Sequence, residues 1–316
     1  MTYELPTPTN PLNIGTRGSP LALAQAYETR DRLAAAFDLP DEAFAIQVIM
    51  TTGDRVLDRP LKEIGGKGLF TREIEQAMLD GAIDIAVHSM KDMPVLQPEG
   101  LVLDTYLPRE DVRDAFISLA DGGLLDMAVG SVVGTSSLRR QAQLRLRRPD
   151  LTVVEFRGNL QTRLKKLGDK VADATFLAMA GLKRLKMDDV PRVPIEVDDM
   201  LPAVAQGAIG IERRISDART ADMLAAIHDD PTGQQLAAER AFLAALDGSC
   251  ETPIAGLAQL SGTSLRLRGQ VLRPDGSEAI SDDMTVSIAD GAAAGQEMAA
   301  KLLAQAGDGF FDWRTG

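Results

Sequence analysis

The sequence has few of the side chains that bind metals or form disulfides. It contains one cysteine and two histidines among 316 residues. A single cysteine cannot form a disulfide within its own chain, and so few thiols and imidazoles leave little material for a zinc or copper site. We therefore expect no metal, and a reducing compartment such as the cytoplasm.

The sequence also lacks a long apolar run and an export signal. No segment approaches the roughly 20 apolar residues that span a bilayer. Residues 1–6 have neither the basic region nor the apolar region of a secretory signal. We expect a cytoplasmic protein with no membrane partner.

Acidic residues exceed basic ones and give a net charge of −12, which disfavours general nucleic-acid binding. Residues 135–192 are the exception, because they hold 14 Lys and Arg against 6 Asp and Glu, a local net charge of +8. A basic segment inside an acidic chain indicates a local anion site, unless it is an ordinary solvated helix face.

Short apolar segments alternate with helical patterns through the first two thirds of the chain. Strands are expected at 46–50, 83–87, 129–133, 152–156 and 175–179, and helices at 20–36, 71–80, 137–147 and 159–167. This alternation predicts an α/β architecture with mainly parallel sheets and helices between the strands.

The C-terminal part follows a different pattern. We expect a helix at 234–246, strands at 254–260, 264–272 and 278–288, and a final helix at 293–305. Residues 273–277 carry a hairpin signal between the second and third strands. The pattern predicts a small α+β domain with an antiparallel sheet, joined to the rest through a linker at 229–233.

Three of the predicted helices begin with a capping side chain beside arginines. The residues are Arg17 and Ser19; Thr135, Ser137, Arg139 and Arg140; and Arg157, Asn159 and Arg163. Arginine near a helix N-terminus is mildly unfavourable unless an anion is present. Backbone N–H groups, hydroxyls and guanidinium groups together bind carboxylates or phosphates. Three such helix starts predict an acid-binding site; the alternative is that these arginines pair with surface acids.

Two further motifs predict chemistry. Lys91 and Asp92 follow the strand expected at 83–87, and ligands bind at the carboxyl ends of strands in α/β sheets. A carboxylate there can move a proton or stabilise a developing cation, although an ordinary ion pair is the alternative. The glycine-rich segment 65–70 ends in Phe70; it is not a P-loop, because Gly68 follows Lys67, and it is typical of a lid or of a plain turn.

The only cysteine, Cys250, lies in a glycine-containing turn between a predicted helix and a predicted strand. A turn presents its backbone and side chains at the surface, where a partner can reach them. The alternative is a small buried side chain, as most unpaired cysteines are.

In this order and spacing the motifs resemble the porphobilinogen deaminase family, also called hydroxymethylbilane synthase. The matching segments are 16–23, 65–70, 88–92, 134–140, 157–159, 180–185, 201–207 and the turn around Cys250. The resemblance implies a transferase of tetrapyrrole (haem, chlorophyll, corrin) biosynthesis. Such an enzyme joins four porphobilinogen molecules head to tail, with release of ammonia, onto a dipyrromethane primer, and hydrolysis then releases hydroxymethylbilane.

The resemblance also implies a domain organisation. Two domains like those of type II periplasmic binding proteins would comprise residues 1–107 with 204–225, and residues 108–203. A third, residues 230–316, would carry the cysteine. A monomer is implied, with porphobilinogen as its small-molecule partner.

Roles for individual residues follow from the resemblance. Asp92 would be catalytic, and dipyrromethane would be joined to Cys250 by a thioether. The other cofactor-binding residues would be Lys91, Asp92, Thr135, Ser137, Arg139 and Arg140, and the substrate-binding residues Arg17, Ser19, Phe70, Arg157, Arg163 and Arg184. Two positions depart from the family pattern, because Ser249 replaces a frequent glycine and Glu251 a frequent amide.

Two other functions compete with this interpretation. A carboxylate-binding or phosphate-binding protein without catalysis would need the same arginines. A nucleic-acid-binding helix at 136–148 would need a basic face, but the net charge of −12 and the spread of arginines around that helix disfavour it.

Overall fold

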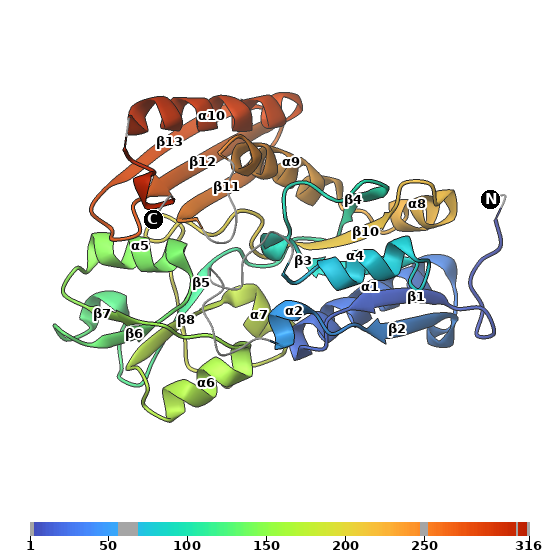
Figure 1. Ribbon diagram of the computed structural model, residues 1–316, viewed down its shortest axis with the longest axis horizontal. Coiled ribbons are helices and arrows are strands. Elements are labelled where there is room, and N and C mark those ends of the chain that lie inside the picture. The colour runs from blue at the N-terminus through green and yellow to red at the C-terminus, as the bar shows by residue number, and fades with distance from the viewer. Residues whose placement is uncertain (1–2, 56–68, 247–251, 308, 315–316) are drawn as a thin grey trace. The chain divides into compact units, whose positions relative to one another are not determined.

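The computed structural model describes residues 3–55, 69–246, 252–307 and 309–314 (Figure 1). The chain forms two compact units. The first comprises residues 1–110 and 208–233, and the second residues 111–207 and 234–316. Among the described residues, no helix is both long enough and apolar enough to cross a membrane.

The first unit contains a five-stranded sheet in the order β2-β1-β3-β10-β4. Its strands are β1 (Leu12–Thr16), β2 (Phe44–Val48), β3 (Ile85–Ser89), β4 (Leu101–Tyr106) and β10 (Ile209–Arg214). β1 is parallel to β2 and to β3, whereas β10 is antiparallel to both β3 and β4. Four strands therefore run in one direction, and β10, which comes from late in the chain, runs in the other.

Helices cover both faces of this sheet. They are α1 (Pro20–Phe37), α4 (Arg72–Leu79) and α8 (Ala218–Ala225), and a short helix, α2 (Thr52–Arg55), follows β2. On β3, Ile85 belongs to the same apolar cluster as Leu33 of α1, whereas the next residue, Ala86, belongs to the cluster of Ile74 in α4. Burial on both faces explains why β3 is buried at four consecutive residues, whereas β4 alternates between buried and less buried ones.

The second unit repeats this plan. Its sheet has the order β7-β6-β8-β5-β9, with β5 antiparallel to its neighbours and the other strands running one way. The strands are β5 (Asp114–Ser118), β6 (Val132–Gly134), β7 (Thr152–Val154), β8 (Ala174–Ala178) and β9 (Val193–Pro194), and the helices are α5 (Leu138–Arg147), α6 (Leu160–Gly168) and α7 (Met179–Arg184).

The second unit also includes a three-stranded antiparallel sheet, shown in orange and red in Figure 1. The strands of this sheet are β11 (Ile254–Ser261), β12 (Ser264–Leu272) and β13 (Ala279–Ser287). The helix α9 (Asp230–Ala245) precedes them in the chain, and α10 (Gly291–Ala306) follows them. Short 3₁₀ turns complete the chain: η1 (Asp41–Ala43), η2 (Met90–Asp92), η3 (Leu124–Asp126), η4 (Ile288–Asp290) and η5 (Asp312–Arg314).

The predicted fold class is confirmed: mostly parallel sheets with helices, and a small antiparallel sheet at the C-terminus. The chain passes from the first unit to the second between Gly233 and Gln234, at the end of the linker predicted at 229–233, but residues 230–233 of that linker form the first turn of α9. The cause is local, because the Asp229 side chain accepts a hydrogen bond from the Thr232 N–H (2.8 Å) and caps the helix, and proline is tolerated in a first turn.

Gly295 allows α10 to approach α9 closely. A β-carbon added at Gly295 would lie 2.3 Å from the carbonyl oxygen of Ala238 and 2.8 Å from the nitrogen of Phe242, both backbone atoms of α9. Backbone atoms cannot move aside as a side chain can, so only glycine is accommodated at this crossing.

We expect Gly295→Ala to lower the free energy of unfolding by about 2 kcal/mol, as overpacking of a core does. Gly168→Ala is the matched control, because a β-carbon added at Gly168 meets no atom within 4 Å; it should be neutral or stabilise by up to about 1 kcal/mol. Urea unfolding of the two variants tests this, and equal unfolding midpoints would contradict it.

Candidate functional site

In the first unit, predicted site residues lie at the carboxyl ends of neighbouring parallel strands. Arg17 follows β1, and Lys91 and Asp92 lie in η2 directly after β3. Because β1 pairs in parallel with β3, these ends share one edge of the sheet, where ligands bind in α/β folds. Asp92 is exposed to solvent.

Helix α1 is fixed to this edge at two points. Ser19 caps the helix as predicted, since its Oγ accepts a hydrogen bond from the Ala22 N–H (3.3 Å). One turn further along, the buried Gln25 donates from Nε2 to the Ser89 Oγ (2.9 Å) at the end of β3. The residues that precede Lys91 and Asp92 are therefore fixed by α1.

Arg17 and Phe70, which were predicted to bind substrate, are in contact. The guanidinium carbon of Arg17 lies 4.3 Å from the centre of the Phe70 ring. The same guanidinium group forms a two-point ion pair with Asp54, with Nε 3.1 Å from Oδ2 and Nη2 bonded to Oδ1. Asp54 was not among the predicted site residues.

His88 does not point toward solvent beside Asp92. Its Nε2 atom lies 3.0 Å from the carboxylate of Glu212, and both side chains are buried. Burial raises the pKa of the neighbouring Glu75, and the negative charge of Glu212 raises it further, although Thr71 and His88 oppose the rise. Glu75 and Glu212 are buried inside the unit, whereas Asp92, in the turn that follows β3, is exposed.

In the second unit, Arg139 and Arg140 at the start of α5 share one buried carboxylate. Arg139 Nη2 donates to Asp114 Oδ2 (2.8 Å), and Arg140 donates from Nη2 (2.7 Å) and Nε (3.2 Å) to Oδ1. Gln206 Nε2 adds a hydrogen bond of 3.0 Å to the same oxygen. Asp114 is fully buried, and each arginine is only 4% exposed.

This cluster holds two positive charges and one negative charge. Burial raises the pKa of Asp114, but the two arginines lower it by more, so it lies well below the ordinary value and Asp114 is ionised. Burial also lowers the pKa of Arg139. Among the described residues, the buried Nε of Arg139 has no hydrogen-bond partner. No further acid among the described residues balances the second positive charge, and an anion could do so.

Hydroxyl groups organise the N-terminus of α5. Thr135 is buried, and its Oγ1 accepts a hydrogen bond from the Ser137 N–H (3.2 Å). Ser137 caps the helix as predicted, with the Arg140 N–H at 3.5 Å from its Oγ. The backbone thus brings two hydroxyls and two guanidinium groups to one helix start.

The remaining predicted arginines hold loop carbonyls. Arg163 donates from Nε to the carbonyl of Gly158 (2.9 Å), so it folds back on the loop that carries Arg157. Asn159 caps α6 as predicted, through the Thr162 N–H at 2.9 Å. Arg184 donates from Nη2 to the Gly207 carbonyl (3.0 Å). The structure brings Arg157 and Arg163 into one loop–helix junction.

Some predictions lie outside the described residues. They are Cys250 with its neighbours Ser249 and Glu251, and the glycine-rich segment 65–68 with Lys67. Within the parts of the chain that are described, no group of three or more His, Cys, Asp or Glu side chains is placed to hold a metal ion.

Sequence reasoning missed Asp54, Asp114 and Gln206. Asp114 contacts arginines that follow it by 25 and 26 residues, and Gln206 lies 92 residues further along the chain. No local spacing connects such positions. The available signal was Asp114 itself, a charged residue at the start of an apolar strand, which requires a buried partner.

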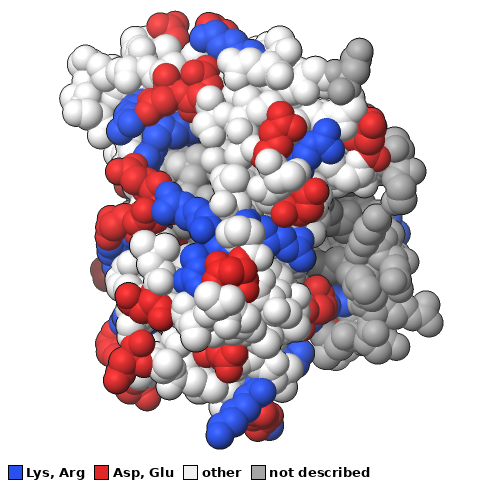
Figure 2. All heavy atoms as spheres, turned by 90° about the vertical axis from the view of Figure 1, so that its left-hand side faces the viewer, with Lys and Arg blue, Asp and Glu red and all other residues white. Residues whose placement is uncertain are grey.

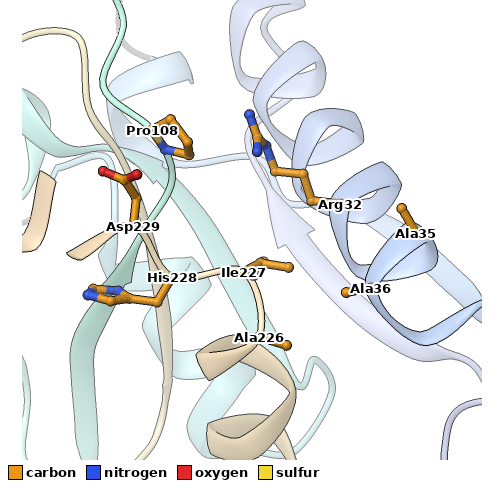
Figure 3. Close-up of a pocket in the computed structure, with 8 residues that line it drawn as sticks. All are labelled: Arg32, Ala35, Ala36, Pro108, Ala226, Ile227, His228 and Asp229. Atoms are coloured by element: carbon orange, nitrogen blue, oxygen red, sulfur yellow. The ribbon is translucent and has the colours of Figure 1, made fainter. Parts of the chain in front are cut away.

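A shallow pocket of about 360 Å³ lies in the first unit between α1 and residues 226–229 (Figure 3). Arg32 lines one side and His228 the other, and none of the predicted site residues lines it. His228 is engaged there, because its Nδ1 accepts a hydrogen bond from the Tyr106 N–H (3.2 Å). The pocket therefore has no share in the predicted chemistry.

Charges are mixed on the face that Figure 2 displays. Figure 2 shows basic and acidic side chains interspersed on the face that it displays, rather than one basic field. On α5, Arg147 pairs with Asp199 (2.8 Å), and Arg148 following the helix pairs with Asp150 (2.6 Å). Paired arginines are poorly suited to the sequence-independent binding of phosphates.

Comparison with known proteins gives a family match over most of the chain. Residues 12–222 match the family described as "Porphobilinogen deaminase, dipyromethane cofactor binding domain", and residues 234–304 match "Porphobilinogen deaminase, C-terminal domain". A curated relative named "Porphobilinogen deaminase", from Paracoccus denitrificans (strain Pd 1222), is 67% identical over 310 residues, which are 98% of this chain and 99% of the relative.

Two periplasmic-type solved structures share a distant likeness with this chain. Lipoprotein Tp32 from Treponema pallidum is 13% identical, with a TM-score of 0.42 over 68% of this chain and 90% of its own. A probable amino-acid ABC transporter extracellular-binding protein, ytmK from Bacillus subtilis, is 11% identical, with a TM-score of 0.41 over 68% and 88%. Likeness at this level carries no argument about substrate or mechanism.

We expect Asp114→Asn to lower the free energy of unfolding by about 3 kcal/mol at neutral pH, because it leaves two buried arginines without their counter-ion. Because the pKa of Asp114 is depressed in the folded state, its stabilisation is present above the unfolded pKa of about 4 and is lost as the pH falls below that value. The difference between wild type and variant should therefore shrink in acid.

Urea unfolding between pH 3 and pH 7 measures this difference. Asp199→Asn is the matched control, since it breaks an exposed pair with Arg147 and should cost less than about 1 kcal/mol. A cost for Asp114→Asn no larger than that of the control would contradict the assigned role.

Proposed function

This chain belongs to the porphobilinogen deaminase family, and we propose that its arginines bind the acid groups of substrate and cofactor while Asp92 carries the proton transfers. The enzyme is a transferase that joins four porphobilinogen molecules, with loss of ammonia, and releases hydroxymethylbilane. Each substrate ring carries an acetate and a propionate, so carboxylates accumulate as the product grows. Arginine suits this task because its planar group binds carboxylates at two points.

The family's dipyrromethane cofactor supplies the pyrrole onto which substrate units are added. We propose that Cys250, the only cysteine, holds it through a thioether. Arg139 and Arg140 would bind its acid groups, with help from Thr135, Ser137 and Lys91. The observation that supports this assignment is the single positive charge of the Asp114 cluster that no acid among the described residues compensates.

Substrate would be bound by the other predicted residues, namely Arg17, Ser19, Phe70, Arg157, Arg163 and Arg184. Three observations support this proposal. Arg17 lies at the same sheet edge as Asp92, Arg157 and Arg163 meet at one junction, and Phe70 stacks on Arg17. Each of these arginines is half-buried, so a bound carboxylate would be partly shielded from water, which strengthens its ion pair.

Asp92 is suited to proton transfer by its position. It is exposed in a 3₁₀ turn at the carboxyl end of β3. Its carboxylate has no hydrogen-bond or ion-pair partner among the described residues. A carboxylate there can assist the departure of ammonia, stabilise the positive charge that develops on the substrate, and accept the proton that leaves the attacked ring.

We propose further properties that the family suggests. The domains would be residues 1–107 with 204–225, residues 108–203, and residues 230–316. The protein would act as a monomer in the cytoplasm, without nucleic acid. The alternative, a carboxylate-binding or phosphate-binding protein without catalysis, is not favoured, because a relative 67% identical over nearly the whole chain is a deaminase.

The thioether can be tested by the intact mass of the purified protein. We expect wild type to exceed its polypeptide mass by two linked substrate-derived pyrroles, and Cys250→Ala to show the bare polypeptide mass. If wild type lacks the excess, porphobilinogen is added and a ladder of masses is sought. No added mass in either experiment would contradict covalent attachment and favour the binding-protein alternative.

The role of Asp92 can be tested with Asp92→Asn. We expect kcat to fall by about a hundredfold to ten-thousandfold, the range typical of a lost general acid or base, while the unfolding midpoint stays unchanged because the side chain is exposed. Glu99→Gln removes another exposed acid that follows β3 and serves as the control. Full activity of Asp92→Asn would contradict the proposal.

A further inference from the structure

We propose that Asp54 is a positioning residue for Arg17, which it orients so that one edge of the guanidinium group is presented to a substrate carboxylate. The inference rests on the proposed role of Arg17 in substrate binding. Neither Asp54 nor its neighbours in α2 belong to the motifs that indicated the reaction.

Asp54 occupies one edge of the guanidinium group. Arg17 Nε and Nη2 donate to the two oxygens of Asp54, the side-by-side geometry of a strong arginine–carboxylate pair. Among the described residues, Nη1 has no hydrogen-bond partner. The Nη1–Nη2 edge can therefore accept a second carboxylate at two points without displacing Asp54.

Phe70 restrains the same group from a different direction. Its ring centre lies 4.3 Å from the guanidinium carbon, a favourable distance for a cation over an aromatic face. The ring also packs against Gly53, where an added β-carbon would lie only 2.3 Å from it. Asp54 holds Arg17 along one edge and Phe70 restrains it on one face, so the side chain has little rotamer freedom before a ligand arrives. Binding a ligand therefore costs less conformational entropy.

Asp54 is itself fixed by hydrogen bonds. The buried Thr51 donates from Oγ1 to Asp54 Oδ2 (2.7 Å), and the Asp54 N–H donates to the Thr51 carbonyl (3.1 Å). Thr52 donates from its N–H (2.9 Å) and its Oγ1 (2.5 Å) to Glu73 Oε1, which ties α2 to the start of α4. The orientation of Arg17 is thus set by a chain of contacts that ends in a helix packed on the sheet.

Asp54 could either weaken or strengthen the binding of substrate by Arg17. Its carboxylate could compete with substrate for Arg17, or it could pre-orient Arg17 for substrate. Burial raises the pKa of Asp54, but hydrogen bonds from Arg17 and Thr51 lower it by more, so the pair is ionised at neutral pH. The geometry favours pre-orientation, because Asp54 uses the Nε–Nη2 edge and leaves the adjacent Nη1–Nη2 edge unused.

The test compares Asp54→Asn, Asp54→Ala and Asp54→Glu in the full-length, primer-bearing enzyme. We expect KM for porphobilinogen to rise roughly threefold in Asp54→Asn, which keeps one acceptor for Arg17, and roughly tenfold in Asp54→Ala, which keeps none. Asp54→Glu restores the charge and should recover part of the loss. In all three variants, kcat should stay within about twofold of the wild-type value. This is expected when a variant weakens binding of the substrate and of the transition state equally.

Asp283→Asn is the matched control, because Asp283 forms the same kind of two-point pair with Arg266 on an exposed strand. It should leave KM unchanged. Intact mass and the unfolding midpoint are recorded for every variant, so that loss of primer or of fold is separated from loss of binding. If the Asp54 variants do not fold, Thr51→Val removes the Oγ1 hydrogen bond that fixes Asp54 and should raise KM; an unchanged KM in that variant would overturn the proposal.

Each outcome decides the matter. A KM that falls in Asp54→Asn and Asp54→Ala would show competition and overturn the proposal, and so would an unchanged KM or a loss confined to kcat. If wild type itself neither carries primer nor consumes porphobilinogen, the proposed function fails. If wild type turns over normally and only the predicted order of KM values is absent, the positioning role alone fails.

Discussion

The arginine-rich helix start of the second unit depends on one buried carboxylate. Two adjacent guanidinium groups could not be kept out of water beside each other without a counter-ion, because the cost of burying unpaired charge would exceed the gain from packing. Asp114 supplies that counter-ion at the first residue of β5, and Gln206 supports it from the segment that precedes β10. Because two arginines share one aspartate, the cluster keeps a net charge of one positive unit. This charge makes the start of α5 a favourable place for an acid group.

In the first unit, too, an aspartate from another element holds an arginine, at a less buried position. Arg17 is held by Asp54, whose side chain is about a quarter exposed, rather than by a fully buried acid. A ligand-binding arginine needs a partner that limits its motion but does not use all of its donors. In both units the aspartate comes from a different element than the arginine, so the recognition geometry is set by packing of the sheet and its helices.

The two sheets explain how such residues come together. Each has four strands running one way and one strand running the other, and each places helix starts or short turns after the parallel strands. Ser19, Ser137 and Asn159 begin their helices at these places. The carboxyl ends of the strands therefore collect capped helix N-termini, hydroxyls and arginines, which is a chemical environment for anions.

Local pattern in the sequence determined much of the molecule. It predicted the helix caps, the principal helices, the antiparallel C-terminal sheet and the segments that carry the family's motifs, because each depends on residues within one or two turns of each other. It did not predict the helical start of α9, where the cap at Asp229 outweighs the proline and glycine that follow. Only the tertiary structure decided that Asp114 neutralises Arg139 and Arg140, that Asp54 holds Arg17, and that His88 faces Glu212. These are contacts between residues 25 to 124 positions apart, and no local periodicity encodes which buried charges will meet once the sheets have formed.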